Sequence, residues 1–462
     1  MNRTYKYLFK NIGILTISNF ASKILIFLLI PLYTSALTVE EYGTYDLIIT
    51  TVQIIFPIIT LNVVDAVIRF LLDRGYSQKE VISIAFKYLI HSFFLVAMFL
   101  IINNQINFII LIRGLELLIF LYYITFVLNQ FFIQFARGIE RFSDLGIASI
   151  LGTVSMLIAN IVFLLIFKWN LEGFFVANIL AQAIPVIYFI FRLNFFDYLI
   201  KIQADSKLKK DMLSYCVPLI FTIISWWINS TSSRYIVAFF CGIEANGILS
   251  IAYKIPSIIN VIQSIFIQAW QVSAIKDFGE ASKKFYSNIL VYYNFILCIA
   301  CSILISLSKP LATILYIKDF YIAWQYVPFL LVSIVFNSMA GFIGPILLAL
   351  KDSKTMAYSA IYGSIINIIL NLILIYILDI QGATIATMIS SYVIYLLRNN
   401  VAKGYFYNDY YKNFYLMWLL LIIQSIFEIY TSYMIFEIVI MIILIFINKN
   451  IILDLVYRKY RI

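Results

Sequence analysis

Apolar stretches of about 20 residues, separated by short polar segments, follow one another along the whole chain. A transmembrane α-helix needs about 20 consecutive apolar residues to cross a hydrocarbon core roughly 30 Å thick. Windows of that length predict about fourteen membrane-spanning helices and therefore an all-α polytopic membrane protein. They cover residues 11–36, 44–70, 80–102, 106–136, 144–167, 173–191, 213–240, 247–273, 285–307, 322–349, 356–378, 382–398, 412–430 and 433–448.

One arrangement of glycine and asparagine occurs twice in this pattern. Gly152 and Asn160 lie in one predicted helix, and Gly363 and Asn371 lie at the same spacing in another. Duplicated helix bundles in so apolar a chain are typical of transporters. We expect the glycine and asparagine pairs themselves to serve helix packing, and their positions to align the two halves of the chain.

The repeat predicts the domain organisation. Two pseudo-symmetric lobes of six helices each are expected, over residues 1–198 and 199–404. Residues 405–462 would then add two C-terminal helices and a cytoplasmic tail.

Composition and charge agree with a membrane protein. Hydrophobic residues make up 63% of the chain and charged residues 12%, which is too little polar surface for a water-soluble domain. About 25 of the 33 Lys and Arg residues fall in alternate loops, at the ends that also hold both termini. Because basic loops are retained in the cytoplasm, both termini are predicted to be cytoplasmic. The net charge of +10 is thus explained by topology and not by nucleic-acid binding.

Groups for catalysis or metal binding are scarce. His91 is the single histidine, and the Cys298 and Cys301 pair lies inside an apolar stretch, where packing is the better interpretation. No nucleotide-binding motif or catalytic triad is present, and no loop is long enough for a catalytic domain. We therefore expect no enzyme activity and no cofactor, with coupling to H⁺ or Na⁺ left open.

Several charged residues lie inside predicted membrane spans. A charge at the bilayer centre costs about 2.5 to 3.5 kcal/mol, so such residues normally face protein or a watery cavity. Those that we consider further include Lys23, Asp65, Lys87, Arg113, Glu116, Arg234 and Lys254.

Lys23 and Arg234 are the strongest candidates for a cationic binding site. Lys23 shares a polar helix face with Asn19, and Arg234 follows a polar stretch that includes Asn229. The alternatives are that a long lysine reaches toward the membrane surface and that hydroxyl and amide groups only hold neighbouring helices together. Lys254 is a third candidate with the same alternative.

Asp65 and Arg69 lie four residues apart near one end of a predicted helix. This spacing predicts an ion pair, which is structural about as often as it is functional. Arg69 is a further candidate for the cationic site, and Asp65 is the candidate for ion coupling.

Prolines and tryptophans lie in the predicted helices that also carry the charged candidates. Proline removes a backbone donor and bends a membrane helix, so proline positions in equivalent helices of the two halves are candidate hinges. They are Pro31, Pro57, Pro218 and Pro256. Aromatic faces suit sugar rings, and the candidates for sugar stacking or cavity lining are Trp226, Trp227 and Trp270 with Asn19 and Asn229.

Four segments resemble the polysaccharide transporter family, the Wzx-type flippases of O-antigen and capsule repeat units. They are residues 23–33 (KILIFLLIPLY), 39–45 (VEEYGTY), 245–256 (ANGILSIAYKIP) and 268–271 (QAWQ). The resemblance extends over nearly the whole chain. It specifies a superfamily that also contains multidrug exporters and peptidoglycan-precursor flippases.

The resemblance implies a flippase for an undecaprenyl-diphosphate-linked oligosaccharide, working by alternating access between two lobes around a cationic cavity. Lys23, Arg234, Lys254 and Arg69 would bind the diphosphate. A polysaccharide polymerase and a chain-length regulator are the implied protein partners, beside the membrane lipids. The alternatives are a cation-coupled multidrug exporter, which would need an acidic pocket, and a peptidoglycan lipid-precursor flippase.

Overall fold

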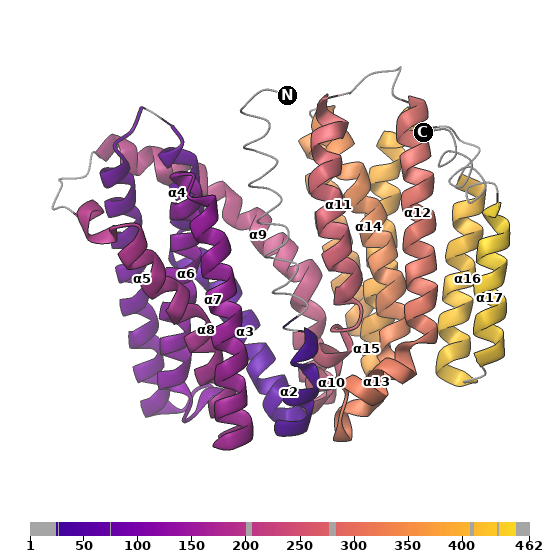
Figure 1. Cartoon of the computed structure of the whole chain (residues 1–462), viewed down its shortest axis with the longest axis horizontal. Coiled ribbons are helices and arrows are strands. Elements are labelled where there is room, and N and C mark those ends of the chain that lie inside the picture. Colours follow the sequence, from indigo (N-terminus) through magenta and orange to yellow (C-terminus); the bar gives the residue numbers. More distant parts are fainter. Residues whose placement is uncertain are drawn as a thin grey trace. The chain divides into compact units, whose positions relative to one another are not determined.

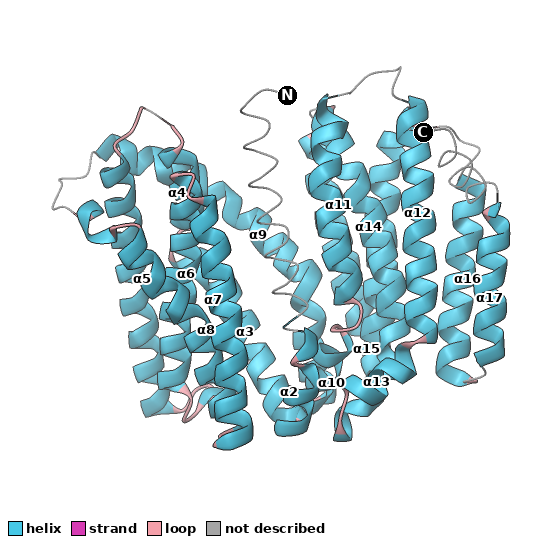
Figure 2. Ribbon diagram, viewed as in Figure 1, coloured by secondary structure: helices cyan, strands magenta, loops and turns pink. Residues whose placement is uncertain are grey.

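The computed structural model describes residues 25, 27–73, 75–199, 206–276, 283–350, 352–406, 411–431 and 434–449. Every regular element in these segments is a helix, joined to the next by a short loop (Figure 2). The predicted all-α class is therefore confirmed. The chain divides into two compact units, Met1–Trp227 and Ile228–Ile462, which we call unit 1 and unit 2.

Unit 1 is a bundle in which α5, α6, α8 and α7 pack side by side, with the short α4 against α5 and α6 (Figure 1). Buried phenylalanines dominate its centre, including Phe131, Phe132 and Phe189, each at most 1% exposed. Its helices are α2 (Ile30–Ala36), α3 (Val39–Ile59), α4 (Val63–Leu71), α5 (Gln78–Ile106), α6 (Glu116–Gly138), α7 (Phe142–Asn160) and α8 (Asn170–Arg192), with short turns η1 (Ile110–Ile112), η2 (Ile161–Ile166) and η3 (Phe195–Tyr198).

Unit 2 is built around α14, which packs against α11, α12, α15 and α16 (Figure 1). Its elements are the second part of α9 (Ser206–Cys241), α10 (Ile243–Ala252), α11 (Ser257–Lys276), α12 (Lys283–Ser306), α13 (Ser308–Leu315), η5 (Lys318–Tyr326), α14 (Val327–Ala349), α15 (Ser353–Ala402), η6 (Lys403–Tyr405), α16 (Tyr411–Tyr430) and α17 (Met434–Ile447).

Among the described residues, ten helices are long and apolar enough to cross a membrane, and a bent pair formed by α10 and the start of α11 makes an eleventh candidate. Two of the predicted spans lie together in α15, which reverses direction at Asp379 (φ 48°). A further predicted span corresponds to the shorter α17. Most of the first predicted span, residues 11–36, lies outside the described residues.

Two predicted spans are interrupted. The span predicted over residues 44–70 breaks after α3, because Leu61 and Asn62 adopt positive φ angles of 52° and 53°. The span predicted over residues 247–273 breaks before Pro256, and the two pieces meet at 47°. Proline cannot donate the helical hydrogen bond at that position, which explains the second break.

The boundary between the units lies inside α9, later than the lobe boundary expected at residues 198 and 199. The first part of α9 is held to unit 1 by side-chain contacts. The Tyr76 hydroxyl donates to Asp211 Oδ2 at 3.3 Å, and Lys209 Nζ lies 5.7 Å from the Tyr88 ring centre. Partial desolvation and the Asp211 charge raise the pKa of Tyr76. The division into two equivalent lobes stays a prediction, because these contacts concern packing and not symmetry.

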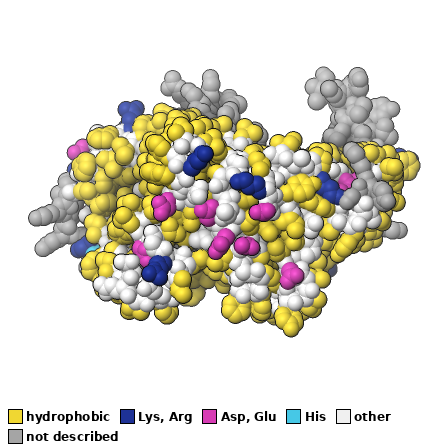
Figure 3. Space-filling view, turned by 90° about the horizontal axis from the view of Figure 1, so that it is seen from below, with side chains coloured by type: hydrophobic (Ala, Val, Ile, Leu, Met, Phe, Trp, Pro, Cys, Tyr) yellow, Lys and Arg dark blue, Asp and Glu magenta, His cyan; other side chains and the backbone are white. Residues whose placement is uncertain are grey.

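Large apolar side chains face outward along the helices. On α5, for example, Phe94, Leu95 and Phe99 are 65%, 53% and 47% exposed. Such flanks of the helices are stable when lipid covers them. Figure 3, seen from below, shows charged groups scattered among hydrophobic side chains.

Candidate functional site

The predicted site residues are divided between the two units. Lys23 and Asn19 lie outside the described residues. The others are Asp65, Arg69, Trp226 and Trp227 in unit 1, and Asn229, Arg234, Lys254 and Trp270 in unit 2.

Arg234 and Lys254 lie on adjoining segments of unit 2. The guanidinium carbon of Arg234, on α9, is 5.4 Å from the ring centre of Tyr253. Tyr253 directly precedes Lys254 in the break between α10 and α11, where both residues are half-buried. A guanidinium over an aromatic face is attracted by the ring electrons, and the attraction strengthens where water is excluded. Arg234 therefore contacts the segment that carries Lys254, through Tyr253.

A network of amides and hydroxyls connects the helix that carries Arg234 to α15. Asn371 Nδ2 donates to Ser233 Oγ at 2.9 Å and to Asn367 Oδ1 at 2.8 Å. Asn367 Nδ2 donates to Ser390 Oγ at 3.0 Å, and Ser232 Oγ donates to Asn367 Oδ1 at 3.1 Å. The network therefore links α9 to both helices of α15 and fixes the helix that carries Arg234.

Asp65 and Arg69 do not form the predicted ion pair. Both oxygens of Asp65 accept from neutral amides, Asn62 Nδ2 at 3.0 Å and Gln134 Nε2 at 3.1 Å. Arg69 instead lies 3.8 Å from Asp73, with 58% of its side chain exposed. The reason is the break before α4, which places Asn62 beside Asp65 in the first turn of that helix.

The tryptophans have three different environments. Trp226 is 46% exposed, whereas Trp227 Nε1 donates to the Thr50 carbonyl of α3 at 3.0 Å. Trp270 is only 3% exposed, and its ring stacks on Phe342 at 4.4 Å. The prediction that Trp270 lines a cavity is therefore corrected to a core position.

Asn229 lies on the same helix as Arg234. Its buried Oδ1 has no hydrogen-bond partner among the described residues.

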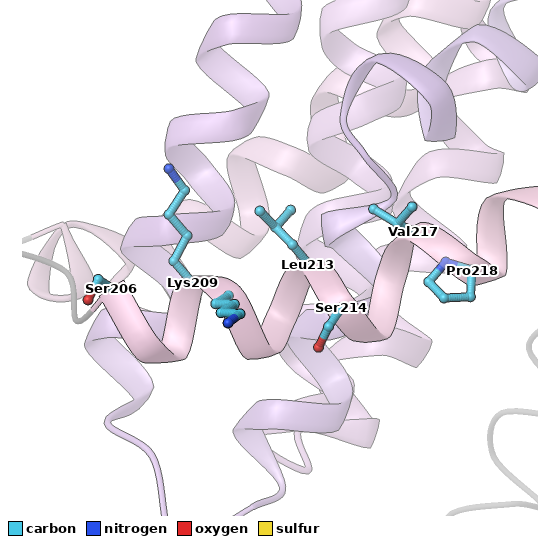
Figure 4. A pocket seen from close by; sticks show the side chains of 7 residues that line it. Ser206, Lys209, Leu213, Ser214, Val217 and Pro218 are labelled. Atoms are coloured by element: carbon cyan, nitrogen blue, oxygen red, sulfur yellow. The ribbon is translucent and has the colours of Figure 1, made fainter.

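The candidate hinges differ in position. Pro31 lies in the first turn of α2, Pro57 lies inside α3 close to its end, Pro218 lies inside α9, and Pro256 lies in the break before α11. Pro218 also borders a shallow pocket of about 510 Å³, lined by residues of α9 alone, among them Lys209 and Ser214 (Figure 4). In Figure 4, Lys209 and Ser214 extend to different sides of the helix. A depression on a single helix brings no separate groups together, so it is a weak candidate for a binding site.

Sequence reasoning missed two polar clusters. One is the pair Asn367 and Ser390, although the spacing of four between Asn367 and Asn371 places both on one helix face and could have indicated it. The other is Asp144, a buried carboxylate that contacts both Arg141 and Arg192 in unit 1. The spacing of three between Arg141 and Asp144 could have indicated that pair. No local pattern reveals the contact with Arg192, which lies 48 residues from Asp144.

Comparison with known proteins identifies the family. A family model described as "Polysaccharide biosynthesis protein" matches residues 8–271. A search of the curated proteins finds no match.

Solved structures share the fold. The chain is similar to a protein titled "Lipid II flippase MurJ, inward closed conformation", with a TM-score of 0.67 and 16% identity over 96% of this chain and 99% of that one. It is also similar to an inward-facing multidrug resistance MATE family transporter of the MOP superfamily, with a TM-score of 0.59 and 14% identity over 84% and 95% of the two chains. The resemblance predicted from the sequence is confirmed, and the chain belongs to the polysaccharide biosynthesis protein family.

Proposed function

We propose that this protein is a flippase. It moves an undecaprenyl-diphosphate-linked oligosaccharide repeat unit from the cytoplasmic to the outer leaflet of the bacterial inner membrane by alternating access, for O-antigen or capsule synthesis. The observation that carries the proposal is the match to a polysaccharide biosynthesis family in a chain with the fold of a lipid II flippase.

The neighbourhood of Arg234 supports an anionic substrate. A diphosphate is bound well by a guanidinium fork together with an ammonium group. Arg234 and Lys254 supply these two groups from adjoining segments, and the Tyr253 ring orients the guanidinium. Their charges act strongly because water is partly excluded around half-buried groups. Lys23 is proposed as a third ligand of the diphosphate, and the exposed Arg69 as a contact at the entrance.

Other residues have supporting roles in this proposal. Trp226, Trp227, Asn19 and Asn229 contact the sugars, and the four prolines act as hinges. Asp65 couples transport to H⁺ or Na⁺, and no further cofactor is required. A polysaccharide polymerase and a chain-length regulator act on the product.

The test is a flipping assay in proteoliposomes that contain a fluorescent lipid-linked oligosaccharide. Arg234→Gln and Lys254→Gln should each slow flipping by about tenfold, since a hydrogen bond to a charged group contributes about 1.5 kcal/mol or more. Lys168→Gln is the matched control, because Lys168 is an exposed residue of a loop. Flipping at the wild-type rate by both variants, with normal insertion, would refute the cationic site.

Two alternative functions are tested in the same vesicles. A peptidoglycan-precursor flippase would move lipid II in preference to the oligosaccharide lipid, as the similarity to a lipid II flippase would suggest. A multidrug exporter would expel a cationic dye in response to an ion gradient. Preference for either substrate over the oligosaccharide lipid would replace the proposed function.

A further inference from the structure

A polar cavity of about 470 Å³ lies at one end of unit 1, where α5 begins, α6 and α7 meet, and α8 ends. Lys79, Arg141 and Arg192 line it from these three places, together with Ser77, Asn194 and Asp197. The candidate site described above uses none of these residues. The cavity therefore calls for a separate explanation.

A buried carboxylate organises the two arginines. Asp144 is 4% exposed, and its Oδ1 accepts from Arg192 Nε at 3.0 Å and from the Tyr188 hydroxyl at 2.7 Å. Arg141 Nη1 lies 3.8 Å from Asp144 Oδ2. Both arginine side chains nevertheless stay more than half exposed, at 55% and 58%. Asp144 thus anchors two guanidinium groups at the cavity while much of their surface stays available to a ligand.

The start of α5 adds to the positive character of the cavity. Ser77 is the N-cap residue of this 29-residue helix, and its side chain makes no capping hydrogen bond. The first amides of a helix have no partners within the helix, and they favour an anion. Lys79 supplies a third cation in the same turn. Of the charged side chains that line the cavity, three are cations and one, Asp197, is an anion. Asp144 is buried against the two arginines, and Glu80 lies in the first turn of α5 but does not line the cavity.

The cavity lies at the level expected for lipid headgroups. Gln78–Ile106, Phe142–Ile166 and Asn170–Arg192 are three of the helices long enough to cross the membrane. Lys79, Arg141 and Arg192 each lie at or beside the end of one of them. A bias of basic residues toward one membrane face explains such charges singly. It explains neither a cavity that three helices share nor a buried carboxylate that holds two arginines together.

We propose that this cavity is a binding site for the phosphate headgroup of an anionic phospholipid. The site takes its ligand from the surrounding leaflet, and it is distinct from the site that binds the transported substrate. Basic pockets between helices at a membrane surface bind such headgroups, and each basic residue near the surface strengthens the attraction. Arg192 and Arg141 bind the phosphate oxygens, and Lys79 and the start of α5 bind the remaining negative charge.

The experiment uses the full-length protein in detergent and native mass spectrometry of retained lipid. Phosphatidylglycerol is compared with phosphatidylcholine of the same chain length. Wild-type protein should retain phosphatidylglycerol in preference, and Arg141→Gln and Arg192→Gln should each reduce that retention by about fivefold. Arg137→Gln is the matched control, since Arg137 lies in the last turn of α6 at the same end of the unit but does not line the cavity.

Lys79→Gln separates loss of binding from loss of folding, because Lys79 does not contact Asp144. This variant should reduce lipid retention while its thermal stability equals that of the wild type. Equal retention of both lipids by wild-type protein, or wild-type retention by all three cavity variants, would overturn the proposal. So would inorganic phosphate that displaces the lipid at low millimolar concentration, because the site would then belong to a soluble anion. The flipping assay reports separately on the proposed function, and neither result depends on the other.

Discussion

The repeated glycine and asparagine pairs have the same packing role in the two units but different polar surroundings. A Cβ on Gly152 of α7 would lie 2.8 Å from the Ala181 carbonyl oxygen of α8. A Cβ on Gly363 would likewise collide with the Ile394 side chain of the opposite helix of α15. Both glycines therefore mark a close approach of two neighbouring helices, which a larger residue would prevent.

The asparagines diverge. Asn160 donates to the Met156 carbonyl of its own helix at 2.7 Å and reaches the Tyr33 hydroxyl only at 3.5 Å. Asn371 instead belongs to the network that joins α9 to α15. The comparison teaches that both glycines allow close helix packing, whereas of the two asparagines Asn371 connects its helix to the helix that carries Arg234.

Gly152→Ala should have the largest effect on this comparison. The added methyl would meet a backbone oxygen and the Pro185 ring, neither of which can move without shifting α8. Overpacking of this kind costs about 2 kcal/mol. The free energy of unfolding in mixed micelles measures it. Stability equal to wild type would show that the two helices separate easily, which would contradict a close contact.

Asn371→Ala should have the second largest effect. It removes the donor to Ser233 and loosens α9 from α15, at a cost of about 1 to 2 kcal/mol for polar contacts inside a membrane. The same unfolding measurement applies, with the flipping assay as a second readout. The network holds the helix that carries Arg234. The flipping rate should therefore fall by more than the loss of folded protein alone would explain. An unchanged flipping rate in a destabilised protein would restrict the network to packing.

Gly363→Ala should be milder than Gly152→Ala. Its methyl meets the Ile394 side chain, which can rotate. Alanine also favours the helix more than glycine does, which offsets part of the lost stability. A net loss of about 1 kcal/mol or less is expected. A larger loss than that of Gly152→Ala would reverse the ranking of the two contacts.

Asn160→Ala should have the smallest effect, about 0.5 kcal/mol, because its main hydrogen bond stays within its own helix. A matched double variant with Asn371→Ala should show additive losses, since the two asparagines belong to different units. A loss for Asn160→Ala as large as that for Asn371→Ala would mean that both units carry equivalent polar connections.

Local sequence patterns predicted the helices well, because the membrane requires about 20 apolar residues for each crossing. They did not predict the break at Leu61 and Asn62. Asparagine tolerates a positive φ angle, but a leucine in an apolar run gives no sign of one. The same limit applies to the site. Arg234 and Lys254 could be chosen as candidates because each is a single charge in apolar surroundings, whereas the core position of Trp270 depends on its contact with Phe342, 72 residues away.

The reversal at Asp379 has a consequence for biosynthesis. The two helices of α15 are joined at one residue with positive φ instead of a loop, and Asn367 and Ser390 already bond across them. We expect the pair to enter the membrane together as a helical hairpin, because each helix covers polar groups of the other that lipid could not solvate. A ribosome that pauses between them would leave Asn367 without Ser390, so slow translation at this hairpin should reduce the yield of inserted protein.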